Sequence, residues 1–353
     1  MGRHALATLD ERGAGSRPRF VSIDVLRVGL DLDGSLESLG NSMTDLADAL
    51  DATHQCELVR FHSLSAPRSA GVARLRGRAL WAPLWRRGLG LALDRLLEPL
   101  DVIHVAGRAT PPTKRTPLII SVDDLRPLRG ESHEHQRINQ LRRAVAHGAL
   151  LVASTRSASH EVRRVLDIER ARVVVVPPAV PNVEPTVNGS ALVVNLTGVV
   201  EPFLKLSADL VTFAQRRGAR VEAVASASVA QRIRARGVDV KLRSRAEARA
   251  ALADARVVWH ISDGARFPSF AIAALAAGVP TIARATAINR ELLGGAAALT
   301  ESDDDVLPLL EDLWDSSSRR AITIAAGRSR AADFAPATAA RAYVALYREV
   351  VRG

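Results

Sequence analysis

Short apolar runs alternate with longer amphipathic stretches along most of this chain. The runs consist mainly of valine, leucine and isoleucine, a composition typical of strands buried inside a parallel sheet. Such alternation predicts βαβ units. In the first half, the predicted strands are 25–32, 56–61, 101–105, 118–122, 150–154 and 172–176. The predicted helices between them include 42–50, 136–146 and 157–166.

A cluster of prolines then interrupts the alternation, at Pro177, Pro178, Pro181 and Pro185. Proline breaks helices and central strands, so this segment is interpreted as an interdomain linker. The alternation restarts with strands predicted at 191–196, 220–225, 238–242, 257–261 and 281–283. Helices are predicted at 206–216, 245–253 and 267–277, and a closing helical region at 306–313 and 319–350.

This organisation predicts an α/β protein with two doubly wound domains that face each other across a cleft. The first domain is assigned to residues 20–185 and the second to 186–335, with the boundary between Val180 and Val193. Residues 336–353 form a separate C-terminal helix, and residues 1–19 are interpreted as a disordered leader. Ligands of doubly wound sheets bind at the carboxyl ends of the strands, which places the expected site in the cleft.

Length and composition fit this organisation. The chain has 353 residues, of which 47% are apolar, enough for two packed cores. Its single cysteine, Cys56, excludes an internal disulfide framework and suits a reducing cytosol. No apolar run reaches the roughly 20 residues that span a bilayer, and the first 19 residues lack the apolar core of a secretory signal. We therefore expect a cytoplasmic protein.

The formal net charge of +10 has two explanations. It can attract phosphate groups, or it can reflect the arginine and alanine usage of a GC-rich genome. Because the basic residues are scattered without interleaved aromatics, nucleic acid is not an expected partner. The histidines show no metal-ligand spacing, so no metal is expected. The segment 80–100, with Trp81 and Trp85 before two arginines, is either a membrane-surface helix or a helix packed on the first domain.

Several segments, in the right order from about Val25 to Val350, resemble glycosyltransferase family 4, whose members have the GT-B fold with two Rossmann-like domains. The first domain carries RVGLDLDGSLESLGNSMTDLADAL, DVIHVAG, PPTKRTPLIISVDDLRPL and GALLVASTRSASHEVRRVLDIERARVVVVPPAVP. The second carries ALAAGVPTIARATAINRELLGGAAAL and GRSRAADFAPATAARAYVALYREV. No single motif among these is specific; the resemblance rests on their order.

The resemblance implies a function for each domain. It implies an acceptor bound by the N-terminal domain, a nucleotide-sugar donor bound by the C-terminal domain, and a last helix that returns to the N-terminal domain. It further implies retaining transfer of a hexose to a glycan or a lipid-linked acceptor, without a metal. The nucleotide-diphosphate sugar is a substrate, so no cofactor is expected. Peripheral contact with the inner membrane face would serve a lipid-linked acceptor.

The phosphate-binding motif of the family matches TGVVEPFLKL only in part. Gly198 is present, Val199 stands where the family has an arginine, and Lys205 lies about one residue from the expected lysine. Cationic side chains at a helix N-terminus would stabilise the leaving diphosphate. Gly198 and Lys205 are thus candidate donor-binding residues, although a solvated lysine at a helix start explains Lys205 equally well.

The second family motif, two glutamates separated by seven residues, matches GARFPSFAIAALAAGVP. Both glutamate positions hold alanine, Ala265 and Ala273, and alanine cannot bind a ribose hydroxyl. Asp263 could substitute only if the loop is reshaped. The candidate donor-binding residues that remain are Arg266, Phe267, Pro268 and Ser269, where backbone N–H groups could hold a phosphate. A surface role is the alternative for Arg266.

In the N-terminal domain, SVDDL matches a family segment with a histidine near the reacting sugar. Asp123 takes the place of this histidine and Asp124 matches the aspartate that follows, so both are candidate catalytic residues. Capping of a turn is the alternative role for Asp124. Gly34 and Gly40 flank the first loop, a candidate acceptor-side loop, although a turn with positive φ explains both glycines as well.

The sequence leaves three functions to be compared. The first is a nucleotide-sugar-dependent glycosyltransferase with altered donor contacts. The second is a catalytically inactive relative that binds a ligand or a partner subunit, because four departures (Val199, Ala265, Ala273 and Asp123) all fall on the expected cleft. The third, nucleic-acid binding, rests on charge alone. The complete fold, with the retained Gly198, Lys205 and Phe-Pro-Ser turn, favours the transferase.

Overall fold

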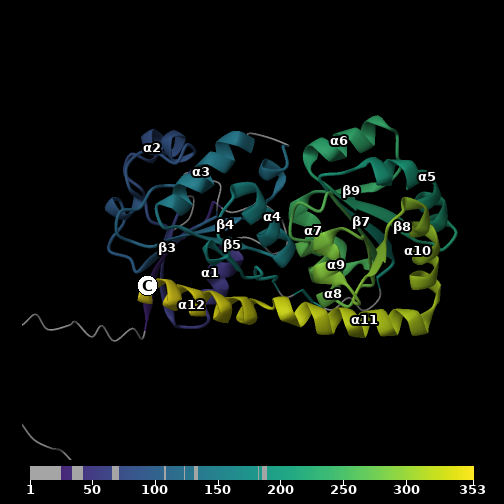
Figure 1. Cartoon of the computed structure of the whole chain (residues 1–353). Coiled ribbons are helices and arrows are strands. Elements are labelled where there is room, and N and C mark those ends of the chain that lie inside the picture. The colour runs from purple at the N-terminus through teal and green to yellow at the C-terminus, as the bar shows by residue number, and fades with distance from the viewer. Residues whose placement is uncertain are drawn as a thin grey trace, which may run out of the picture.

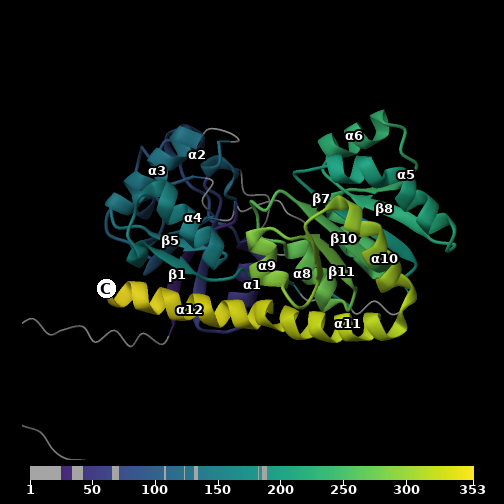
Figure 2. The same ribbon diagram turned by 45° about the vertical axis from the view of Figure 1, so that its right-hand side comes forward.

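The computed structural model describes residues 25–33, 43–65, 71–106, 109–122, 124–130, 134–181, 183–184 and 189–353. It consists of two α/β lobes side by side, with two C-terminal helices running beneath both (Figures 1 and 2). Each lobe contains a six-stranded sheet in which every pairing is parallel. The prediction of two doubly wound domains is therefore confirmed.

The N-terminal sheet has the strand order β2-β1-β3-β4-β5-β6. Its strands are β1 (Leu26–Asp31), β2 (Cys56–Phe61), β3 (Val102–Val105), β4 (Leu118–Val122), β5 (Leu150–Ala153) and β6 (Val173–Val175). Its helices are α1 (Met43–Asp51), α2 (Arg78–Trp85), α3 (Glu134–Ala146) and α4 (Arg156–Leu166). In α2 the Trp85 side chain is fully buried and donates to the Leu91 carbonyl, so one face of this helix packs on its own domain.

The C-terminal sheet has the order β9-β8-β7-β10-β11-β12. Its strands are β7 (Ala191–Thr197), β8 (Arg220–Val224), β9 (Lys241–Arg243), β10 (Ala255–Ser262), β11 (Thr281–Arg284) and β12 (Ala298–Thr300). Its helices are α5 (Glu201–Gln215), α6 (Ala227–Ala235), α7 (Ala248–Ala253), α8 (Ser269–Ala276), α9 (Ala287–Leu293) and α10 (Val306–Asp315). The direction of winding reverses between β7 and β10, the place where such sheets bind ligands.

Two sequence predictions need correction, and the elements β12, α6 and α9 are additional to those predicted. The predicted strand 238–242 is reduced to β9, since the Val240 N–H donates to the Val238 carbonyl in a turn before it. The predicted helix 319–350 is two helices, α11 (Ser317–Ala331) and α12 (Pro336–Arg352), because Pro336 begins a new helix.

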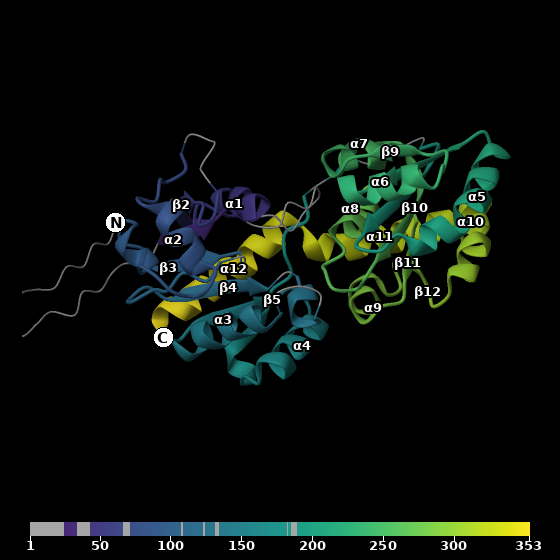
Figure 3. The same cartoon turned by 90° about the horizontal axis from the view of Figure 1, so that it is seen from above.

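Helix α12 joins the C-terminal end of the chain to the N-terminal domain, where it packs on α1 and lies beneath the first sheet (Figure 3). The fully buried His104 of β3 fixes it there: its Nδ1 lies 2.8 Å from the Tyr347 hydroxyl of α12, and its Nε2 lies 2.8 Å from the Ser121 hydroxyl of β4. The last helix therefore belongs physically to the first domain.

Buried titratable groups make the stability of this fold dependent on pH. Burial lowers the pKa of His104 to about 3 and that of His260 in β10 to about 4. Burial, with repulsion from Asp33, raises the pKa of Asp31 at the end of β1 to about 6. Below the ordinary histidine pKa the unfolded chain takes up two protons that the folded chain does not, which favours unfolding. Asp31 acts in the opposite direction, because the folded chain takes up its proton first.

We expect the free energy of unfolding to fall by about 2 kcal/mol between pH 7 and pH 5, with the two histidines outweighing the single carboxyl group. Urea titrations followed by circular dichroism at the two pH values measure this difference. Equal or greater stability at pH 5 would contradict the assignment of both histidines as neutral in the fold.

Candidate functional site

The reversal point of the C-terminal sheet is bounded by the loops that follow β7 and β10. Gly198 begins the first loop with φ of 85°, a conformation that favours glycine. A β-carbon at this position would clash with the Asp263 carboxylate of the second loop. Asp263 also accepts a hydrogen bond of 2.9 Å from the Ala265 N–H. A carboxylate therefore lies beside the glycine to which the sequence assigned a phosphate.

Below these loops, four buried polar residues face each other on β7 and β10. The strand register pairs Asn195 with His260 and Thr197 with Ser262. Asn195 Nδ2 donates to His260 Nδ1 at 2.9 Å, which leaves Nε2 as the N–H of the neutral ring. His260 Nε2 and Ser262 Oγ have no hydrogen-bond partner within the described residues. This group was not predicted from the sequence, although polar residues at alternate positions of two apolar strands were its signal.

Lys205 lies on α5, and its side chain is 58% exposed and paired with Asp304 at 2.8 Å. The ion pair, through its hydrogen bond, raises the pKa of Lys205 and lowers that of Asp304. An incoming phosphate would have to compete with this carboxylate. Exposed pairs of this kind typically contribute at most about 1 kcal/mol, so the competition is weak.

The N-terminus of α8 lies inside the molecule. Phe267, Pro268 and Ser269 are all buried, and the Ser269 N–H already donates to the Phe267 carbonyl at 2.9 Å. The Phe267 ring packs edge to face on Phe334, with ring centroids 5.7 Å apart. In the described structure, apolar contacts therefore surround the backbone groups that the sequence assigned to a phosphate.

The two alanines that replace the glutamates of the family motif are also buried. Ala265 is 1% exposed and Ala273, in the middle of α8, is 0% exposed. The α8 side chains next to Ala273 are apolar and buried as well. The missing carboxylates have therefore been replaced by packed core and not by open space.

The two domains touch directly at the carboxyl ends of β4 and β10. The Leu125 N–H donates to the Ala265 carbonyl at 3.0 Å, and Asp124 forms an antiparallel bridge with Arg266. The Asp124 carboxylate accepts two hydrogen bonds from Arg126 Nε, at 2.9 and 3.0 Å, and lies 3.4 Å from Arg266 Nε. Asp124 and Arg266, predicted from different domains, thus meet in one site.

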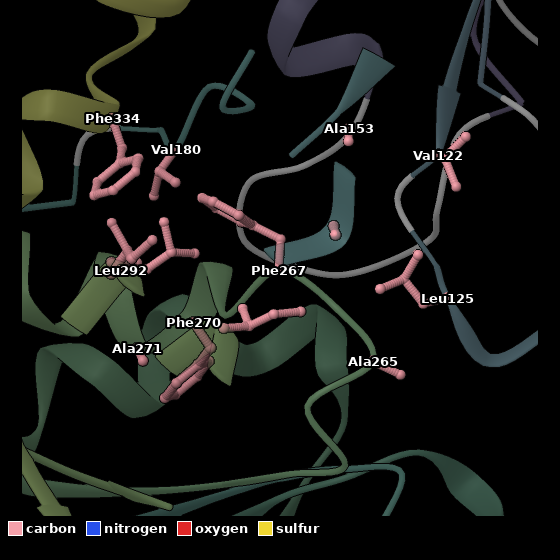
Figure 4. Close-up of a cluster of buried hydrophobic side chains, with 14 of the residues drawn as sticks. Val122, Leu125, Ala153, Val180, Ala265, Phe267, Phe270, Ala271, Leu292 and Phe334 are labelled. Atoms are coloured by element: carbon pink, nitrogen blue, oxygen red, sulfur yellow. The ribbon is translucent and has the colours of Figure 1, made fainter. Parts of the chain in front are cut away.

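An apolar cluster surrounds this contact and continues through both domains. It includes Val122 and Leu125 from the N-terminal domain and Phe267 and Phe270 from the C-terminal domain. Figure 4 shows Phe267 directed toward Val180 and Phe334, and Leu125 beside Ala265. A continuous apolar interface resists relative motion of the domains. In the described conformation the two domains are therefore closed against each other at this interface.

A second interdomain contact lies at the N-terminus of α4. Glu291 of α9 accepts hydrogen bonds from the Arg156 N–H at 2.7 Å, the Ser157 N–H at 2.9 Å and the Ser157 hydroxyl at 2.7 Å. Burial alone would raise the pKa of Glu291, but these hydrogen bonds outweigh it and lower the pKa. A carboxylate at a helix N-terminus is stabilised by the helix dipole as well.

In the N-terminal domain, the end of β1 is joined by hydrogen bonds to the loop after β2. Asp31 accepts a hydrogen bond of 2.6 Å from the Ser63 hydroxyl, and Asp33 lies 3.1 Å from His62 Nδ1. Burial by itself would raise the pKa of Asp33, but the hydrogen bonds from Ser65 and Leu64 together outweigh it and lower the pKa. The predicted residues Gly34, Gly40 and Asp123 lie outside the described residues.

The described part of the chain contains no group of three or more histidine, cysteine, aspartate or glutamate side chains placed to hold a metal ion. Within the same residues, no helix has the length and apolar character needed to cross a membrane.

Comparison with known proteins gives structural likeness only. No family model matches the sequence, and no curated protein matches it significantly. HepE from Anabaena, solved with UDP and glucose, aligns with a TM-score of 0.62 at 17% identity, over 91% of this chain and 99% of its own. The N-terminal domain of Candida albicans trehalose-6-phosphate phosphatase gives 0.61 at 10% identity, over 95% and 98%.

WaaG, a glycosyltransferase involved in lipopolysaccharide biosynthesis, gives a TM-score of 0.60 at 13% identity, over 92% of this chain and 99% of its own. At these identities the likeness establishes architecture. Since nearly the whole length of each structure is matched, the chain has the GT-B fold.

Proposed function

We propose that this protein is a nucleotide-sugar-dependent glycosyltransferase. The observation that carries the proposal is the meeting of the two carboxyl edges at Asp124 and Arg266, within a fold that matches almost all of UDP-bound HepE. The C-terminal domain binds the donor beside the reversal point between β7 and β10, and the N-terminal domain binds the acceptor. The reaction is hexose transfer to a glycan or lipid-linked acceptor, with retention and without a metal.

The donor contacts differ from those of the family motif. Ribose binding by a glutamate is absent, because Ala265 and Ala273 offer no polar side-chain atom. Loss of one charged hydrogen bond typically costs about 1.5–3 kcal/mol of binding. Phosphate attraction to arginine therefore contributes most of the donor affinity.

A second candidate is a catalytically inactive relative that binds a nucleotide or a partner subunit. The observation in its favour is the hydrogen bond between Leu125 and Ala265, which joins the domains where the reacting sugar would lie. The two candidates share nucleotide binding and differ in turnover.

We expect weak binding of nucleoside diphosphates, with less than about tenfold discrimination between bases, because phosphate contacts do not distinguish bases. The affinity should fall as ionic strength rises, since partly exposed charges are screened by salt. Calorimetric titration of UDP, GDP and ADP at low and high salt measures both effects. Tight, base-selective and salt-independent binding would show that another residue has taken the carboxylate role.

Incubation with the matching UDP-, GDP- and ADP-sugars then separates the two candidates. Release of the nucleoside diphosphate in the presence of an acceptor mixture supports the transferase. Binding without release over many hours supports the inactive relative, and absence of binding by any of these nucleotides contradicts both.

The surface around α2 favours peripheral contact with a membrane that carries a lipid-linked acceptor. Leu80 is 65% exposed and Leu89 is 49% exposed, and Arg86 and Arg87 beside them are exposed as well. Exposed leucines among arginines suit an anionic lipid surface. A cytoplasmic location at the inner membrane face fits this surface and the single buried thiol of Cys56.

A further inference from the structure

We propose that Asp124 is an internal counter-ion in the place of a ligand phosphate, and that a diphosphate displaces it from Arg126 and Arg266. The proposal rests on the function proposed above, since it assigns the diphosphate of the nucleotide sugar to these arginines. Of the two arginines, Arg266 lies in the second family motif and Arg126 lies outside both donor motifs.

The geometry of Asp124 is that of an anion held between two domains. Arg126 binds it from the N-terminal side in a fork, with Nε at 2.9 and 3.0 Å from the two carboxylate oxygens and Nη2 in contact with Oδ2. Arg266 approaches from the C-terminal domain at 3.4 Å. Guanidinium groups bind phosphate in the same forked manner, so a phosphate oxygen can replace a carboxylate oxygen.

A third arginine lies close to Arg126. Arg245, at the start of the short helix η4 (Arg245–Glu247) after β9, is half-buried and close enough to Arg126 to be repelled by it. Burial, and then this repulsion, lower the pKa of Arg245. Like charges held near each other are stabilised by an anion with more charge than one carboxylate, which a diphosphate provides.

The alternative phosphate position is less favourable. At the reversal point, the Asp263 carboxylate lies against Gly198, where a second anion would meet a like charge. Lys205 is paired with Asp304 and is far more exposed than Arg266, 58% against 16%. Charge attraction is weaker at an exposed site, because water screens it. The arginines around Asp124 therefore attract a diphosphate more strongly than Lys205 does.

Displacement of Asp124 has a local structural consequence. Besides the two arginine side chains, the Asp124 carboxylate accepts a hydrogen bond of 3.0 Å from the Arg126 N–H, which caps the turn after β4. A diphosphate that displaces the carboxylate therefore has to replace this acceptor as well.

The test compares two matched neutral variants by calorimetry with inorganic pyrophosphate and with UDP. Asp124→Asn removes the proposed counter-ion, and Asp304→Asn removes the carboxylate that is paired with Lys205. We expect Asp124→Asn to bind pyrophosphate about tenfold more tightly than the wild type, and Asp304→Asn to bind within about twofold of it. Arg266→Gln should bind about tenfold more weakly. Thermal melts check that each variant is folded.

Two results overturn the proposal while nucleotide binding stands. One is binding of UDP by the wild type with no gain of pyrophosphate affinity in Asp124→Asn. The other is a gain in Asp304→Asn alone, which would place the diphosphate at Lys205. If pyrophosphate behaves as expected but no nucleoside diphosphate binds, the counter-ion stands and the glycosyltransferase function fails.

Discussion

Ala273→Glu, which restores the second glutamate of the family motif, should destabilise the protein and not restore base-selective nucleotide binding. The Ala273 side chain is 0% exposed, in a helix whose neighbouring side chains are apolar and buried. An unpaired buried carboxylate costs several kcal/mol, here about 4 kcal/mol or more. We expect the melting temperature to fall by about 10 °C or more, or the variant to be insoluble.

A matched control is Ala208→Glu on the exposed face of α5, which should melt within about 2 °C of the wild type. Differential scanning calorimetry of the two variants gives the comparison. A stable Ala273→Glu variant with new base-selective nucleotide binding would contradict the burial of this position, and would show that α8 moves to open a donor site.

Glu291→Ala should give the second largest effect, because it removes a carboxylate that joins the two domains. Its three hydrogen bonds at the N-terminus of α4 come from Arg156 and Ser157, and its side chain is 16% exposed. We expect a loss of about 2–3 kcal/mol in the free energy of unfolding. Hydrogen exchange should also become faster at the Arg156 and Ser157 amides, which lose their acceptor.

Glu301→Ala is the control, since Glu301 pairs with Arg290 but is 72% exposed and should contribute less than about 1 kcal/mol. The hydrogen bonds lower the pKa of Glu291. Its contribution to the free energy of unfolding is therefore present above the ordinary glutamate pKa and is lost as the pH falls through the lowered value. Unchanged stability and exchange in Glu291→Ala at pH 7 would show that the apolar interface alone holds the domains.

Much of the architecture could be predicted from the sequence. Apolar runs predicted strands such as β2 and β4 with correct bounds, because side-chain periodicity is a local property of the chain. The proline cluster separated the stretches that form two sheets. The absence of glutamate at Ala265 and Ala273 could be read directly once the motif was aligned. Short elements, β12 and α9 among them, were missed because a few residues carry too little periodic signal.

By itself the sequence determined two doubly wound domains, their order along the chain and which amino acids stand at the motif positions. Only the tertiary structure decided which of these residues meet: Asp124 with Arg266, Lys205 with Asp304, and Glu291 with the start of α4. It also decided that the N-terminus of α8 is covered by apolar side chains. Helix and strand patterns arise from neighbours along the chain, whereas these pairs join segments far apart in sequence. Their contacts depend on how two finished sheets pack edge to edge, which local periodicity does not encode.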